Sequence, residues 1–250
     1  MEIILRLPDE IEKARASNHI VAEVLSKLRE KIRPGVKTKD LDKFAEEIAE
    51  KRGAKPAFKG YRGYPHSLCI SINEEVVHGM PSKRVLEEGN IVSLDFGIYY
   101  QGFYGDSAIT LPVGKVTEKA LRLMQITECS LYAGIEQAKV GNRLGDVSAA
   151  VQNTVEDAGF SVVRDFVGHG IGKSLHEEPQ IPNFGKKGRG IELKSGMILA
   201  IEPMVNEGEY KVRILADGWT VVTKDGSLSA HFEHTVAITD NGPDILSKLN

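Results

Sequence analysis

Two aspartates, eleven positions apart, lie in a segment that is typical of a β-hairpin. The segment from Ile91 to Thr110, IVSLDFGIYYQGFYGDSAIT, has two apolar stretches around a polar, glycine-containing centre. With a turn near Tyr100-Gln101, Asp95 and Asp106 are opposite or nearly opposite on adjacent strands, where Cβ atoms are ~4.5–5.5 Å apart. Two carboxylates that close repel each other unless they share a proton or a cation lies between them. The pair alone also fits a simpler interpretation, in which one aspartate faces solvent and the other caps a turn.

Three further candidate metal ligands lie in the second half of the chain. His169 occurs in VGHGIGKSLHEEP, Glu202 ends the apolar stretch MILAIEP, and Glu233 interrupts HFEHTVAIT. Each alone has an ordinary structural interpretation, but carboxylates inside apolar strands are costly to bury without a partner, and no basic residue alternates with them. Four carboxylates and one imidazole suit Mn, Fe, Co or Zn. Because four carboxylates exceed what one ion needs, the set predicts two ions about 3.5–4 Å apart.

Hydrophobic periodicity predicts the elements that must position these side chains. Apolar residues at helical spacing predict helices over about 9–32, 38–53, 117–141 and 144–158. Pro34-Gly35 stops the first helix, and Thr38 and Thr117 are candidate N-terminal residues of the second and third. Alternating or continuous apolar runs predict strands over 68–72, 91–96, 104–110, 197–201, 220–223 and 231–239. The glycine- and aromatic-rich segment 58–64 is expected to be a loop.

The second and fourth predicted helices indicate an internal repeat. At an offset of 106 positions the matching pairs are Gly35 and Gly141, Asp40 and Asp146, Glu50 and Glu156, and Gly53 and Gly159. Chance is an alternative, since glycine often ends helices. The repeat predicts an α+β fold of two related halves, about 1–110 and 111–250, that share one core. Because no Pro/Ser-rich linker separates them, we expect residues 1–250 to form a single domain.

Composition limits the classes of partner. The chain has 250 residues, 41% hydrophobic and 27% charged, with a formal net charge of -3, so neither nucleic acid nor an anionic membrane is an expected partner. No apolar run approaches the ~18–20 residues that span a bilayer. The first residues, MEIILRLPDEIEKAR, lack the features of a secretory signal. With two cysteines in all, the sequence fits a reducing compartment, and we expect a cytoplasmic protein.

Five segments together resemble the type I methionine aminopeptidases in their short bacterial form. They are PAFKGYRGYPHSLCISINEEVVHGMP, SLDFGIYYQGFYGDSAIT, VGHGIGKSLHEEPQIPN, GMILAIEPM and DGWTVVTKDGSLSAHFEHTVAIT. The resemblance covers nearly the whole chain. It implies the pita-bread fold, in which two pseudo-symmetric halves, each of two helices plus antiparallel strands, surround one curved sheet. It also implies removal of the initiator methionine from nascent proteins, with a preference for a small second residue.

The resemblance assigns roles to the five candidate ligands. Asp95 would bind one metal ion, and His169 and Glu202 the other, while Asp106 and Glu233 would bridge both. A bridging hydroxide would attack the first peptide carbonyl, and Glu202 would accept its proton.

The resemblance also implies residues that contact the substrate. His78 would contact the peptide group near the leaving nitrogen, and His176 would steady the scissile carbonyl. The methionine side chain would be bound by Phe58, Tyr61, Tyr64, Cys69, Leu175 and Trp219. Phe58 stands where the family often has cysteine, and Leu175 where it often has phenylalanine, which affects pocket shape rather than reaction class. By themselves the aromatic residues fit an ordinary core, and Cys69 fits an inert buried thiol.

Two alternative functions share the expected fold. A proline aminopeptidase or prolidase has the same ligands but usually an additional N-terminal domain, and a non-catalytic pita-bread binding module typically loses ligands. We expect neither an N-terminal extension nor the helical insertion that type II enzymes carry between Glu202 and Glu233. The expected partners are nascent polypeptide N-termini, with contact at the ribosome a possibility, and the expected state is a monomer.

Overall fold

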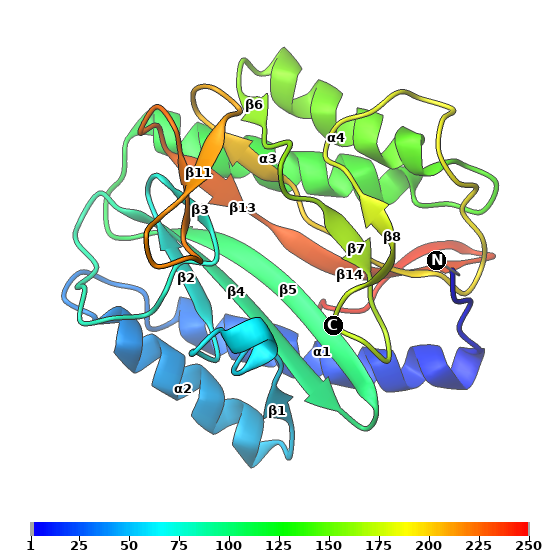
Figure 1. Cartoon of the computed structure of the whole chain (residues 1–250), viewed down its shortest axis with the longest axis horizontal. Helices are drawn as coiled ribbons and strands as arrows, with labels where there is room; N and C mark the ends of the chain where they lie inside the picture. The colour runs from blue at the N-terminus through cyan, green and yellow to red at the C-terminus, as the bar shows by residue number, and fades with distance from the viewer. Residues whose placement is uncertain (1–2, 250) are drawn as a thin grey trace.

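Four helices cover the outside of a curved sheet in the computed structural model, which describes residues 3–249 (Figure 1). They are α1 (Pro8–Arg29), α2 (Thr38–Lys51), α3 (Glu118–Gln137) and α4 (Leu144–Asp157). All four predicted helices are confirmed, although α1 ends at Arg29, before the predicted stop. No helix among residues 3–249 is both long and apolar enough to cross a bilayer.

The predicted N-terminal residues of two helices had different outcomes. Thr117 caps α3, because its side chain accepts a hydrogen bond from the Ala120 backbone N–H. The helix α2 begins at Thr38, as predicted, but Thr38 does not cap it, because Lys37 occupies the N-cap position. The Thr38 hydroxyl instead donates to the Ser82 carbonyl and accepts from the Ser82 N–H, so it ties α2 to a neighbouring loop.

One nine-stranded antiparallel sheet runs through both halves of the chain. Its order is β1-β4-β5-β14-β9-β7-β8, with β2 paired to β4 and β15 paired to β14. The strands are β1 (Lys55–Pro56), β2 (Cys69–Ile72), β4 (Ile91–Tyr100), β5 (Phe103–Pro112), β7 (Gly168–Gly170), β8 (Glu177–Ile181), β9 (Ile198–Ile201), β14 (Glu233–Thr239) and β15 (Gly242–Ile245). The halves meet where β5 pairs with β14, with Ser107 opposite His234.

Two three-stranded sheets complete the fold, in the orders β13-β10-β6 and β11-β12-β3. Their strands are β3 (Glu75–Val77), β6 (Ser161–Val162), β10 (Met204–Asn206), β11 (Val212–Ile214), β12 (Val221–Thr223) and β13 (Ser229–His231). The single strand predicted over 231–239 was wrong, because the chain leaves one sheet at His231 and enters another at Glu233. The predicted loop 58–64 contains a short 3-10 turn, η1 (Tyr61–Gly63).

The apolar faces of the helices pack on the sheet in two main clusters. In the first half, Leu28 and Leu41 from α1 and α2 pack with Leu94 of β4. In the second half, Val147 of α4 packs with Leu199 of β9. Burial of these side chains stabilises each helix pair against its part of the sheet, at about 25 cal/mol per Å² of apolar surface. The opposite face of the large sheet is therefore free to carry polar groups.

Candidate metal centre

The hairpin formed by β4 and β5 carries two of the predicted ligands. Its turn lies at Gln101-Gly102, both with left-handed backbone angles, one position later than predicted. Asp95 therefore pairs with Ala108, and Asp106 pairs with Gly97, so the two acids are diagonal neighbours, which agrees with the prediction that they are opposite or nearly opposite. Because side chains alternate with a period of two, the diagonal acids still point to the same face of the sheet.

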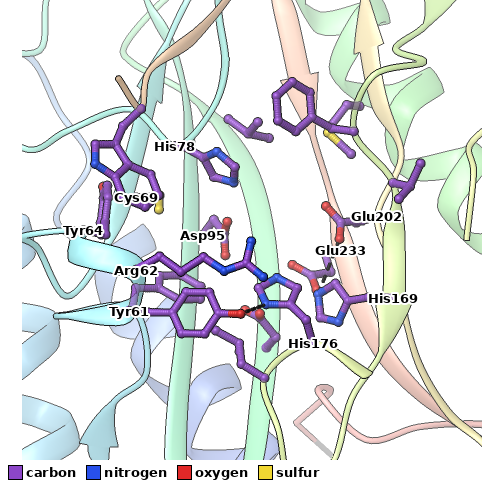
Figure 2. Close-up of a pocket in the computed structure, with 18 residues that line it drawn as sticks. Tyr61, Arg62, Tyr64, Cys69, His78, Asp95, His169, His176, Glu202 and Glu233 are labelled. Atoms are coloured by element: carbon purple, nitrogen blue, oxygen red, sulfur yellow. Dashed lines mark hydrogen bonds and ion pairs between the residues drawn. The ribbon is translucent and has the colours of Figure 1, made fainter. Parts of the chain in front are cut away.

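The strands of the second half bring the other predicted ligands to this face. Figure 2 shows Glu233, His169 and Glu202 pointing toward the same space as Asp95. Single ligand atoms of Asp106, His169 and Glu233 lie within 4.8 Å of one another. His169 Nε2 is 3.6 Å from Glu202 Oε1. All five side chains line one cavity, which the order β4-β5-β14-β9-β7 builds from five neighbouring strands.

The donor atoms in this cavity lack protein partners. Asp95 Oδ1, Asp106 Oδ1 and Glu233 Oε1 are buried and accept no hydrogen bond. Buried polar atoms are rarely left unsatisfied, so these oxygens call for a positively charged group. His169 donates from Nδ1 to the Gly170 carbonyl at 2.9 Å, which leaves Nε2 unprotonated as a ligand atom. Oxygen donors with one imidazole fit a divalent metal ion.

Burial shifts the pKa of every ligand in the direction that favours the neutral form of that side chain. It raises the pKa of Asp95 to about 7 and that of Glu202 to about 8. Burial, with repulsion from neighbouring carboxylates, also raises the pKa values of Asp106 and Glu233 well above their ordinary range. Burial lowers the pKa of His169 to about 3. Four acids so close together are costly to ionise, and a bound cation stabilises their ionised forms.

Comparison with known proteins agrees with this arrangement. Residues 12–240 match the model of metallopeptidase family M24. The chain is 56% identical over 247 residues to the methionine aminopeptidase of Clostridium perfringens, and the match covers 99% of each chain.

The chain belongs to metallopeptidase family M24.

Solved structures place it within the family. The structure of the Thermotoga maritima methionine aminopeptidase is 51% identical in sequence and superposes with a TM-score of 0.98, covering 99% of this chain and 100% of that one. A prolidase from Pyrococcus horikoshii OT3 has a TM-score of 0.80 at 24% identity, and this chain matches 64% of that longer one. The prolidase likeness shows the shared fold alone. The predicted α+β pita-bread fold is confirmed, and the chain is grouped with the methionine aminopeptidases of M24.

The cavity that holds the ligands has a volume of about 190 Å³ and is lined by every residue that the sequence predicted for the site. Beside the ligands, the side chains of Phe58, Tyr64, Cys69 and Leu175 are buried and form its apolar wall. The Tyr64 ring packs edge-on against Trp219, with centroids 5.1 Å apart. Burial raises the pKa of the Cys69 thiol well above its ordinary value, so this wall carries no charge near neutrality. The cavity thus combines a polar floor with an apolar side pocket.

Two histidines lie between the ligands and the apolar wall. His176 Nδ1 is 2.8 Å from the Tyr61 hydroxyl (Figure 2). His78 has a left-handed backbone, and its ring packs edge-on against Phe166. A side chain at Gly79 would approach the Ile70 carbonyl oxygen to 2.2 Å, so glycine is needed to bring His78 this close to β2.

The protonation of these two histidines follows from their burial. Burial lowers the pKa of both His78 and His176 to about 4, with a further contribution at His176 from Arg62. Both imidazoles are therefore neutral at pH 7 and can donate one hydrogen bond each.

Sequence reasoning missed several residues of the cavity. Arg62, Val77, Phe166, Val167 and Met204 also line it. Arg62 follows Tyr61 in the predicted loop, and its guanidinium lies 5.4 Å from the Tyr61 ring centroid. Behind the ligands, the buried His231 lies 3.5 Å from Glu202. Its place two residues before Glu233, and therefore on the same face of the strand predicted over 231–239, was the available signal.

Proposed function

We infer that this M24 metallopeptidase acts as a methionine aminopeptidase and hydrolyses the first peptide bond of polypeptides that begin with methionine. The observation that carries the inference is a cluster of buried, partnerless carboxylate oxygens beside an apolar pocket. The 56% identity to a methionine aminopeptidase over the full chain supports it. A prolidase function has support only from distant relatives that share the fold. A non-catalytic binding module is disfavoured because all five ligand positions are filled.

We propose that the centre holds two divalent ions, drawn from Co, Mn, Fe or Zn. Asp95 would bind one ion, His169 and Glu202 the other, and Asp106 and Glu233 both. The support is the number of carboxylates, which exceeds what one ion neutralises. Bound divalent metal supplies an activated water and polarises the scissile carbonyl.

Glu202 is our candidate for the proton acceptor. Its carboxylate lines the cavity 3.6 Å from the ligand His169, where it would accept the proton of the activated water and pass it onward. We assign the Tyr61 hydroxyl as donor to His176 Nδ1, which leaves a proton on Nε2 that faces the cavity. His176 would donate this hydrogen bond to the developing oxyanion. One preorganised donor of this kind stabilises the transition state by about 3–4 kcal/mol.

His78 would orient the leaving nitrogen. Because its imidazole is neutral at pH 7, donation of a hydrogen bond explains its role better than transfer of a proton. Phe58, Tyr64, Cys69, Leu175 and Trp219, with Tyr61 at the edge, would bind the methionine side chain. An apolar aromatic wall with one sulfur suits a flexible thioether. A narrow site for the next residue would favour small second residues.

We further propose that residues 1–250 act as one monomeric catalytic domain in the cytoplasm; residues 1–2 and 250 lie outside the described structure. The support is the nine-stranded sheet, which joins both halves. The expected partners are nascent N-termini, at the ribosome or after release. A net charge of -3 and the lack of a membrane-spanning helix among residues 3–249 favour neither nucleic acid nor a bilayer as partner.

Peptide turnover by chelated and metal-reloaded protein tests this function. We expect the chelated protein to be inactive, and Mn, Fe, Co or Zn added anaerobically to restore methionine release from Met-Ala-Ser and Met-Gly-Met. Peptides with proline first, or with proline second after a residue other than methionine, are the matched controls. Release of proline, or cleavage of Xaa-Pro, without turnover of Met-Ala-Ser would assign the chain to the prolidase group.

A further inference from the structure

His231 is a buried histidine with an unsatisfied ring nitrogen close to the metal centre. Its exposed fraction is 1%. Its Nε2 is buried and forms no hydrogen bond, yet it lies 3.5 Å from Glu202 Oε2. A buried nitrogen without a hydrogen-bond partner is destabilising. An isolated structural histidine would therefore be unfavourable here, and the nearby carboxylate points to a specific role.

The backbone of His231 is held in place by a hydroxyl chain across three strands. The Thr110 hydroxyl of β5 donates to the His231 carbonyl at 2.7 Å and accepts from the His231 N–H at 2.9 Å. Ser93 of β4 lies 2.8 Å from the same hydroxyl. Since the single Thr110 proton is already used, Ser93 must be the donor in this pair. These hydrogen bonds fix the backbone from which the imidazole extends.

The carboxylate of Glu202 lies between two imidazoles. Oε1 is 3.6 Å from His169 Nε2, and Oε2 is 3.5 Å from His231 Nε2. The backbone of Glu202 is also fixed, because Asn183 donates from Nδ2 to its carbonyl at 3.0 Å. Each carboxylate oxygen thus faces a different histidine. His169 is a predicted metal ligand, whereas nothing so far assigns a role to His231.

We propose that His231 is a positioning residue for Glu202. Its Nε2–H donates to Oε2, which holds that oxygen away from the centre and leaves Oε1 to face His169 and the metal. A movement of a few tenths of an ångström brings the two atoms into hydrogen-bond range. The proposal rests on the proposed function in one respect, namely that Glu202 binds metal and accepts a proton.

The expected effect follows from how ligands of this type behave. A carboxylate that can rotate about its last bond exchanges its two oxygens, whereas a hydrogen bond to one oxygen fixes which of them meets the metal. Groups that orient a ligand in this way typically change metal affinity or activity by 10–100-fold when removed. Loss of the His231 donor should therefore weaken metal binding itself, as well as turnover.

The first test compares His231→Leu with His231→Gln. Leucine fills the space without a donor, whereas glutamine places an amide N–H near the former Nε2. His19→Leu, on the outer helix α1, is the matched control. By calorimetric titration with Mn²⁺, we expect His231→Leu to bind about 10–100-fold more weakly and His231→Gln to stay within about threefold of wild type. Wild-type affinity in His231→Leu, or equal loss in both variants, would overturn the proposal.

A second measurement needs no variant, in case His231→Leu does not fold. In the wild-type protein loaded with diamagnetic Zn²⁺, ¹⁵N NMR of the histidine rings reports which nitrogen carries the proton. We expect a protonated Nε2 at His231, and an unprotonated Nε2 would overturn the proposal. These readouts are independent of substrate. If the variants differ as expected but wild type does not cleave Met-Ala-Ser, the proposed function fails while the role of His231 stands.

Discussion

The helices α2 and α4 are near copies of one another, whereas the strands that follow them differ. Both helices have 14 residues and begin 106 positions apart. Each is preceded by a left-handed glycine, at Gly35 and Gly141, and followed by another, at Gly53 and Gly159. The residue directly before each helix also forms an isolated antiparallel β-bridge, between Lys37 and Val85 in the first half and between Arg143 and Glu192 in the second.

The strands show where the two halves diverge. In the first half, β4 and β5 form an unbroken hairpin of two ten-residue strands that supplies only carboxylates. In the second half, Glu202 and Pro203 separate β9 from β10, and Phe232 separates β13 from β14. Beside these breaks lie Glu202, His231 and Glu233. The comparison teaches that the repeated helices are a scaffold, and that the chemistry resides where the copies no longer match.

The largest effect should come from Glu202→Gln. The amide cannot accept the proton, so we expect kcat for Met-Ala-Ser to fall by about 10²–10⁴-fold while the melting temperature of the protein stays near that of wild type. Asp40→Asn, at the exposed start of α2, should leave kcat unchanged. Comparable turnover in wild type and Glu202→Gln would remove Glu202 from the proton-accepting role.

His78→Ala should have the next largest effect. Loss of one oriented donor predicts a fall in kcat of about 10²-fold. Metal affinity should stay at the wild-type value, because His78 belongs to the substrate side of the cavity. Calorimetric titration with Mn²⁺ separates the two roles. A variant that no longer binds the ions would make His78 a ligand, and the division between ligand strands and substrate pocket would need to be redrawn.

The chelated protein should become less stable as pH rises from about 6.5 to 8. The folded-state pKa is raised to about 7 for Asp95 and about 8 for Glu202, above the ordinary unfolded values near 4. Above about pH 6.5, where the histidines are neutral in both states, these acids make the folded protein bind more protons than the unfolded chain. Stability therefore falls by up to about 1.4 kcal/mol per pH unit for each acid until its folded pKa is passed. Below this range the buried histidines, whose folded pKa values are lowered, oppose the trend. Denaturant unfolding across this range measures the slope.

Metal should reverse this trend. Since bound cations favour the ionised carboxylates, the loaded protein should keep or gain stability over the same pH range. Asp40→Asn in the scaffold is again the control, and its slope should match wild type. A flat profile in the chelated protein would mean that these acids are not held together without metal.

The smallest effect should come from Gly53→Ala and Gly159→Ala. Both glycines have left-handed φ angles with open space around the missing Cβ, so the cost is conformational alone, about 1–2 kcal/mol. If the scaffold halves are true copies, the two variants should lose equal amounts in urea unfolding and keep full turnover. A clear inequality would show that the halves contribute unequally to stability.

Much of the fold could be predicted because local patterns dictate it. The apolar periodicity of four helices and the repeated Gly35 and Gly141 were readable, since a helix stop depends on neighbouring residues. The errors share a different cause. The Thr38 hydroxyl binds Ser82, in a loop far along the chain, and does not cap α2. The hairpin turn shifted to Gln101-Gly102, where two left-handed residues fit the twist of the strands.

The residue types by themselves predicted a metal-dependent centre, because acids within apolar strands and a glycine-flanked histidine are costly to bury together without a cation. Only the tertiary structure decided which atoms meet. It placed Asp95 diagonal to Asp106, broke the strand at Phe232, and turned His231 toward Glu202. The physical reason is that strand pairing joins residues more than a hundred positions apart, and a one-residue change in register reverses the face on which each side chain lies.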